Sequence, residues 1–227
     1  MSLIIKIVCP AGIITASDTR EVYSTVDKSI GEKNYINYSD GIKKSFLINK
    51  ISIAIAGNAN IGDKQLKDFF PEFLSSLESE IKYDNLIIEI SNLYKGLKKH
   101  STKYFISFYD EISLNSVYSN YFKFEPYLFC LDTENMSINR LNHDEDGFTF
   151  GFFWGGENER ISKTLREQRT GINANNLTIE SSIQLIKNIF REVQNDFKVT
   201  KEYPTVSENI DITIQTSYSN ELIRNYY

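Results

Sequence analysis

Two short apolar segments near the start of the chain constrain the fold most. Residues 3–9 and 13–17 are rich in Ile, Val and Thr, which favour β-strands. The Pro10-Ala11-Gly12 insert between them has the chemistry of a turn. The sequence therefore predicts an antiparallel hairpin, with the hydroxyl residue Ser2 at its start and the acid Asp18 at its far end.

Blocks of strands and blocks of helices follow the hairpin. Alternating apolar residues predict further strands over 45–48, 50–56, 127–132, 136–141, 148–154 and 210–216. Apolar residues at helical spacing predict helices over 63–78, 84–98, 157–168 and 178–195. Asp63 is the expected cap of the first helix. Two stretches show no clean period, so we expect a long exposed connection over 21–43 and an insertion over 101–125.

This segregated order predicts an α+β protein with antiparallel sheets, because a parallel sheet needs strands and helices in alternation. A four-layer α/β/β/α sandwich, in which helices cover two antiparallel sheets, fits the order of elements. With 227 residues, the chain is long for one average domain and short for two. We therefore expect a single domain over residues 1–227.

Composition argues against several classes of partner. The net charge of -5 disfavours a nucleic-acid partner, because phosphate contacts need a basic face. Cys9 and Cys130 lie inside apolar runs and are expected to be reduced core residues. His100 and His143 are far apart in the sequence, so neither a metal nor a cofactor is expected.

The sequence also favours a cytoplasmic protein without a membrane partner. No apolar run approaches the roughly 20 residues that span a bilayer. The N-terminus lacks a basic region before its apolar stretch and makes a poor signal peptide.

Ser2 suggests a chemical activity. If Met1 is removed, Ser2 carries a hydroxyl and a free α-amine, and such an amine has a pKa of about 7.7–8.0. A nucleophile and a base then lie within one residue. Taken alone, however, a serine after the initiator methionine is common, and an isolated acid such as Asp18 is more often a turn or cap residue.

Taken together, the spacing of these residues matches a known pattern. The chain resembles the proteasome β-type subunit family of N-terminal nucleophile hydrolases, as a bacterial proteasome-like protein would. That family opens with a hydroxyl residue, two strands around a glycine turn, and Asp-x-Arg. Ser2, Gly12, Asp18 and Arg20 match this pattern. The resemblance implies that Ser2 is the nucleophile and Asp18 the first catalytic acid.

Further matches extend the resemblance downstream. Lys44 stands where the family places its catalytic lysine, with Lys43 as the alternative register, and Gly57 stands where it places an oxyanion donor. Ser207 resembles a serine that supports the N-terminal amine. The family's Gly-Ser-Gly is replaced by Gly155-Gly156, without the serine.

The resemblance implies a threonine-type peptidase that uses Ser2 to cut peptides or unfolded proteins. It also implies a homo-oligomeric ring or stack and a possible ATPase partner. Two alternatives stay open. One is a catalytically inactive scaffold or binding subunit, and the other is a small-molecule amidase of the same fold.

Overall fold

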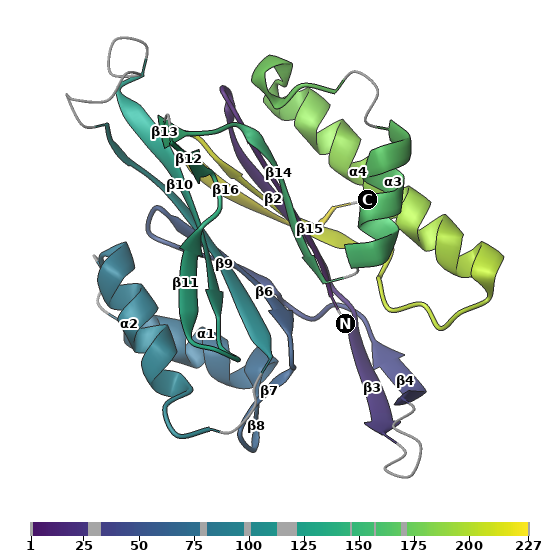
Figure 1. The fold of residues 1–227 in the computed structure, drawn as a ribbon. Helices are drawn as coiled ribbons and strands as arrows, with labels where there is room; N and C mark the ends of the chain where they lie inside the picture. The colour runs from purple at the N-terminus through teal and green to yellow at the C-terminus, as the bar shows by residue number, and fades with distance from the viewer. Residues whose placement is uncertain are drawn as a thin grey trace.

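The computed structural model describes residues 2–26, 33–77, 81–97, 101–112, 122–145, 147–156, 158–168 and 172–226. These residues form an α+β fold with several antiparallel sheets and four α-helices, as Figure 1 shows. Within the same ranges, no helix has the length and apolar character needed to span a bilayer.

The predicted N-terminal hairpin lies at the centre of a five-stranded sheet. Its strand order is β14-β1-β2-β15-β16. The strands are β1 (Leu3–Cys9), β2 (Gly12–Asp18), β14 (Gly151–Gly156), β15 (Ile210–Gln215) and β16 (Asn220–Tyr226). β1 and β2 pair from Ile4↔Ser17 to Cys9↔Gly12, which confirms the hairpin. Its neighbours come from the distant C-terminal third of the chain.

A second five-stranded sheet has the order β11-β10-β9-β6-β5. Its strands are β5 (Ser45–Ile48), β6 (Ile51–Gly57), β9 (Thr102–Glu111), β10 (Phe124–Asp132) and β11 (Ser137–Arg140). The expected insertion over 101–125 is wrong at both of its ends, where β9 and the start of β10 lie, and 113–121 falls outside the described residues. β9 is buried on both faces over Tyr104–Phe108, so it lacks the alternation that marks a half-buried strand.

Helices cover the outer face of each sheet. The pair α1 (Leu66–Ser76) and α2 (Tyr83–Leu93) buries Phe70 and Ile90 against Ile106 of the second sheet. The pair α3 (Asn158–Gln168) and α4 (Ile179–Thr200) packs on the first sheet, where Ile189 joins Ile5 in one apolar cluster. Figure 1 shows the two helix pairs on opposite sides of the molecule.

The start of α1 differs from the prediction. Asp63 lies in a turn between two short strands, β7 (Asn60–Ile61) and β8 (Lys64–Gln65), and Gln65 is the N-cap. Gly62 adopts a positive φ of 57° in this turn. The glycine and asparagine residues before the helix therefore form a tight ribbon rather than the first helical turn.

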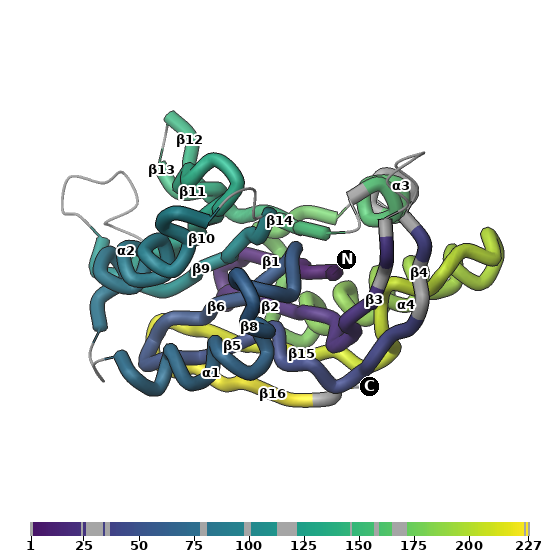
Figure 2. Tube along the Cα trace, turned by 90° about the horizontal axis from the view of Figure 1, so that it is seen from below, coloured from purple at the N-terminus to yellow at the C-terminus, as the bar shows by residue number. Residues whose placement is uncertain are grey.

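Residues 21–43 contain a hairpin that the sequence analysis missed. β3 (Glu21–Val26) pairs with β4 (Lys33–Ser39), and 27–32 lie outside the described residues. Figures 1 and 2 show this ribbon projecting from the end of the sheets, beyond β2. Its residues are mostly polar, so no apolar alternation marks it as a strand pair.

The remaining elements are short and lie at the periphery. They are β12 (His143–Asp144), β13 (Gly147–Phe148) and the 3-10 turn Ala174–Asn176. The predicted strand over 148–154 is split, because Phe148 pairs with β12 and the sheet strand begins at Gly151.

Candidate active site

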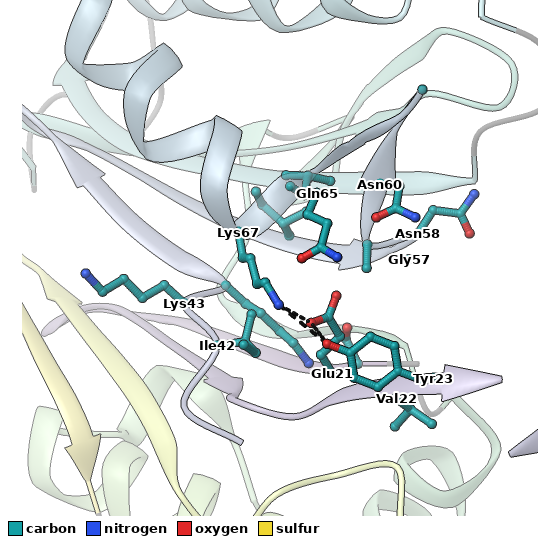
Figure 3. A pocket seen from close by; sticks show the side chains of 16 residues that line it. Glu21, Val22, Tyr23, Ile42, Lys43, Gly57, Asn58, Asn60, Gln65 and Lys67 are labelled. Atoms are coloured by element: carbon teal, nitrogen blue, oxygen red, sulfur yellow. Dashed lines mark hydrogen bonds and ion pairs between the residues drawn. The ribbon is translucent and has the colours of Figure 1, made fainter. Parts of the chain in front are cut away.

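A cavity of about 630 Å³ opens where β1 begins, between β3 and the segment that joins β6 to α1. Three of the five predicted site residues, Ser2, Lys44 and Gly57, line it. The fourth, Asp18, lies behind this wall and is fully buried. Figure 3 shows the cavity with polar side chains from several elements around it.

Asp18 organises the wall of the cavity through its carboxylate. The Lys44 ammonium donates to both carboxylate oxygens at 2.9 Å. The Leu3 N–H donates to Oδ1 at 2.7 Å, and the Arg20 N–H donates to Oδ2 at 3.0 Å. Lys44 also donates to the Arg20 carbonyl. One buried carboxylate therefore holds both Lys44 and the residue that follows Ser2.

Of the two candidate lysines, Lys44 is the one that reaches Asp18. Lys43 is exposed, and its side chain points away from the other labelled residues in Figure 3. The geometry thus favours the register in which Lys44 is the site lysine.

Two glycines near the site lie where neighbouring backbone leaves no room for a side chain. Gly57 has a φ of 116°, and an added Cβ would lie 2.1 Å from the Ser101 carbonyl oxygen. At Gly156, with a φ of 101°, a Cβ would lie 1.4 Å from the Ser2 carbonyl oxygen. Side chains are excluded at both positions, so the end of β6 lies directly against the Ser101 backbone and the end of β14 directly against the Ser2 backbone.

Ser207 is buried and lies away from the cavity. Its hydroxyl accepts from the Thr19 N–H at 2.8 Å and donates to the Asn209 carbonyl at 2.6 Å. Among the described residues, no hydrogen bond joins it to Ser2. Ser207 therefore holds the chain next to Asp18, and the structure gives it no contact with the nucleophile candidate.

A polar cluster that the sequence pattern did not predict lies on the cavity wall. The Tyr23 hydroxyl donates to Glu21 Oε2 at 2.9 Å, and the Lys67 ammonium donates to the same oxygen at 3.2 Å. This hydrogen bond raises the pKa of Lys67. Figure 3 shows the three side chains converging. Glu21 and Tyr23 are two residues apart in the sequence, and this spacing places their side chains on one face only if the segment is a strand.

Arg20 anchors the segment that leads to Lys44. Its guanidinium binds the Asp40 carboxylate through two hydrogen bonds of 2.7 Å, which raise the pKa of Arg20. It also donates to the Pro204 carbonyl at 3.1 Å and lies 3.8 Å from the centre of the Tyr38 ring. Residues from both ends of the chain are thereby tied together beside the site.

The fold and the site together define a class of protein. It is an α+β protein whose first strand begins at a cavity and whose second strand ends in an acid paired with a lysine. Such a site has the hydroxyl, the cation and the backbone donors that nucleophilic amide hydrolysis uses.

Comparison with known proteins supports the fold. A solved structure that shares it is the Anbu (Gly-1) mutant from Hyphomicrobium sp. strain MC1. The likeness has a TM-score of 0.62 and 15% sequence identity, and it covers 99% of this chain and 87% of the Anbu chain. At this identity the likeness establishes the fold alone. No family model matches the chain, and no curated protein matches it.

The expected membership in the proteasome β-type subunit family is therefore wrong. No family model matches the chain, and its likeness to Anbu, at 15% identity, extends to the fold alone. The matches at Ser2, Asp18, Lys44 and Gly57 are isolated positions, and the sequence between them carries no family signal. What the chain shares with the solved structure is its backbone arrangement, at 15% identity.

Proposed function

We propose that this protein is a peptidase that hydrolyses peptide bonds with Ser2 as an N-terminal nucleophile. One observation carries the proposal: Ser2 lines the same cavity as Lys44, and the Lys44 ammonium is ion-paired with the fully buried Asp18. The likeness to the Anbu structure supports the fold on which such chemistry is built. Exposure of the amine requires removal of Met1, which lies outside the described residues.

The chemistry assigns a role to each group. The Ser2 hydroxyl attacks the scissile carbonyl, and its proton passes to the Ser2 α-amine, which later protonates the leaving amine. The Lys44 ammonium, held by Asp18, favours the deprotonated hydroxyl. The Gly57 N–H donates to the oxyanion. Water then hydrolyses the acyl-enzyme and restores Ser2.

The architecture and setting are part of the same proposal. The two sheets with their outer helices would form the four-layer sandwich of N-terminal nucleophile hydrolases. Helix packing supports this, because α1 and α2 contact one sheet while α3 and α4 contact the other. The whole chain would act as one domain.

A peptide or unfolded-protein substrate suits the cavity. The amide side chains of Asn58, Asn60 and Gln65 line it and can hydrogen-bond an extended backbone. A homo-oligomeric ring or stack, a cytoplasmic location and an ATPase partner complete the proposal. The ring and the ATPase partner follow from the resemblance at Ser2, Asp18, Lys44 and Gly57, and the location follows from the N-terminal sequence.

Two measurements test the proposal. Mass spectrometry of native protein should show that Met1 is absent. The processed protein should cleave members of a fluorogenic peptide panel, and Ser2→Ala should lower kcat/KM by at least about 100-fold. Ser75→Ala, at an exposed helix position, is the control and should cleave at the wild-type rate. Retained Met1, or cleavage that survives Ser2→Ala, contradicts the mechanism.

A second candidate function has one observation in its favour. The hydroxyl of Ser207 is engaged by Thr19 and Asn209, so it gives the Ser2 amine no support. This favours a catalytically inactive scaffold or binding subunit. Folded, processed protein that hydrolyses no peptide would support that function, whereas hydrolysis of small acyl amides alone would identify an amidase.

A further inference from the structure

The layer between the two five-stranded sheets contains both apolar and polar side chains. On β1, Ile4 packs with Ala54 and Phe105, and Val8 packs with Leu128. Lys6 lies between Ile4 and Val8 on the same face of β1 and is fully buried. A charged side chain therefore occupies the interior where its neighbours on the strand are apolar.

The Lys6 ammonium has one hydrogen-bond partner among the described residues. It donates to the Ser107 hydroxyl at 2.8 Å, across the gap between the sheets. Ser107 donates in turn to Gln215 Oε1 at 2.6 Å. The Gln215 amide donates to the carbonyls of Lys50 and Ser107 at 3.0 and 3.1 Å. Ser107 and Gln215 are therefore satisfied, but two of the three N–H groups of Lys6 have no acceptor among the described residues.

Three buried hydroxyls around this bond have no hydrogen-bond partner: Thr15, Ser52 and Thr213. The strand register places them together. Thr15 is the cross-strand neighbour of Lys6, Thr213 is the neighbour of Thr15, and Ser52 is the neighbour of Ser107. Directly paired residues share a face of the sheet, so all three hydroxyls lie on the inward faces with Lys6 and Ser107. Thr15 and Ser52 are direct neighbours of the two bonded residues, and Thr213 lies one strand further along.

The buried charge of Lys6 distinguishes between the two species, a water molecule and a small anion, that could accept hydrogen bonds from its leftover N–H groups. No described carboxylate pairs with Lys6, and Asp211 on β15, two strands away from β1, pairs with Arg224. Burial without a counter-charge lowers the pKa of Lys6 to about 7. A water molecule could accept from two of the leftover donors, but it brings no charge. A small anion accepts from the ammonium and the hydroxyls alike and neutralises the buried charge.

We infer that the two sheets enclose a binding site for one monovalent, halide-sized anion, held by the Lys6 ammonium and the hydroxyls of Thr15, Ser52 and Thr213. Sheets that pack about 10 Å apart leave little room for a larger oxyanion beside these side chains. The site is separate from the Ser2 cavity, whose lining contains none of these four residues. The inference therefore does not depend on peptidase activity.

Bromide provides a direct test on the unaltered protein. Crystals grown in sodium bromide should show an anomalous difference peak within hydrogen-bonding reach of the Lys6 ammonium. An ordered water at that position, or no density, in bromide-grown crystals overturns the inference.

Thermal unfolding at pH 6 provides the second test. Sodium chloride should raise the melting temperature above that in sodium gluconate at equal ionic strength. At ten times the dissociation constant, linkage predicts an upward shift of about 3–6 °C. Lys6→Met and Thr15→Val, which remove the ammonium and one hydroxyl at nearly constant volume, should lose most of the shift. The exposed Lys95→Met should retain it. An equal shift in Lys6→Met and wild type would show a general salt effect and contradict a site.

Discussion

Replacing Lys6 by Met should stabilise the folded protein, although it removes a hydrogen bond. Met has nearly the length of Lys and carries no charge, so it removes the cost of burying the ammonium. Ser107 keeps its bond to Gln215 in the variant, so no buried donor is stranded. The apolar residues next to Lys6 on the inner face of β1, Ile4 and Val8, suit a thioether neighbour.

The magnitude follows from the Lys6 pKa. In the unfolded chain Lys6 holds its proton up to its ordinary pKa of 10.5, whereas burial lowers the pKa in the folded protein to about 7. Between these values the unfolded chain binds one more proton, so the free energy of unfolding rises with pH by about 1.4 kcal/mol per pH unit. Below pH 7 the penalty is complete, at about 5 kcal/mol, and above pH 10.5 it is gone.

Urea unfolding in halide-free sodium gluconate measures this difference. Lys6→Met should exceed wild type by about 5 kcal/mol at pH 6, about 3 kcal/mol at pH 8 and about 1 kcal/mol at pH 9.5. The exposed Lys95→Met should differ from wild type by less than about 0.5 kcal/mol at each pH. A stability difference that does not change with pH, or a variant less stable than wild type, would refute the reasoning.

Two further comparisons address the candidate site. Lys44→Met strands the buried Asp18 carboxylate, so urea unfolding should show a loss of about 3–5 kcal/mol, against less than about 0.5 kcal/mol for the exposed Lys43→Met. Equal losses would contradict the register that pairs Lys44 with Asp18. Gly156→Ala should cost about 3 kcal/mol or more in thermal unfolding, because its Cβ would meet backbone. Gly96→Ala, at a φ of 85° in open space, should cost only about 1 kcal/mol, and similar costs at both glycines would argue against the close approach to Ser2.

The sequence predicted the elements that carry a regular apolar period or a clear turn or cap. The N-terminal hairpin and the amphipathic helix α4, with its Thr178 capping box, were both visible in the sequence. β9 was not, because both of its faces are covered and its apolar residues do not alternate. β3, β4 and the edge strand β16 were missed for the opposite reason, since their polar residues carry no apolar period.

The site residues also divide into those that the sequence indicated and those that only the structure reveals. The resemblance, not the local pattern, grouped Ser2, Asp18, Lys44 and Gly57. In the structure Ser2, Lys44 and Gly57 line one cavity. Lys44 binds Asp18, a contact between the end of β2 in one sheet and the residue before β5 of the other, which no hairpin pattern predicts. The contact of Lys67 with Glu21 joins a helix to a ribbon that the sequence did not reveal. The structure gives Ser207 no contact with Ser2, because its hydroxyl is bound by Thr19 and Asn209, whose positions depend on how the last strand enters the sheet.

Strand order has a consequence for the order of folding. The sheet of β5, β6, β9, β10 and β11 uses one continuous stretch, residues 45–140, and its contacts close comparatively short loops. The sheet around the N-terminal hairpin must wait for β14 and β15, and Asp18 pairs with Ile210. Closing so long a loop costs entropy before any contact compensates for it. A chain emerging during synthesis therefore carries Ser2 and Lys44 early but lacks the frame that aligns them until nearly all of the sequence is present.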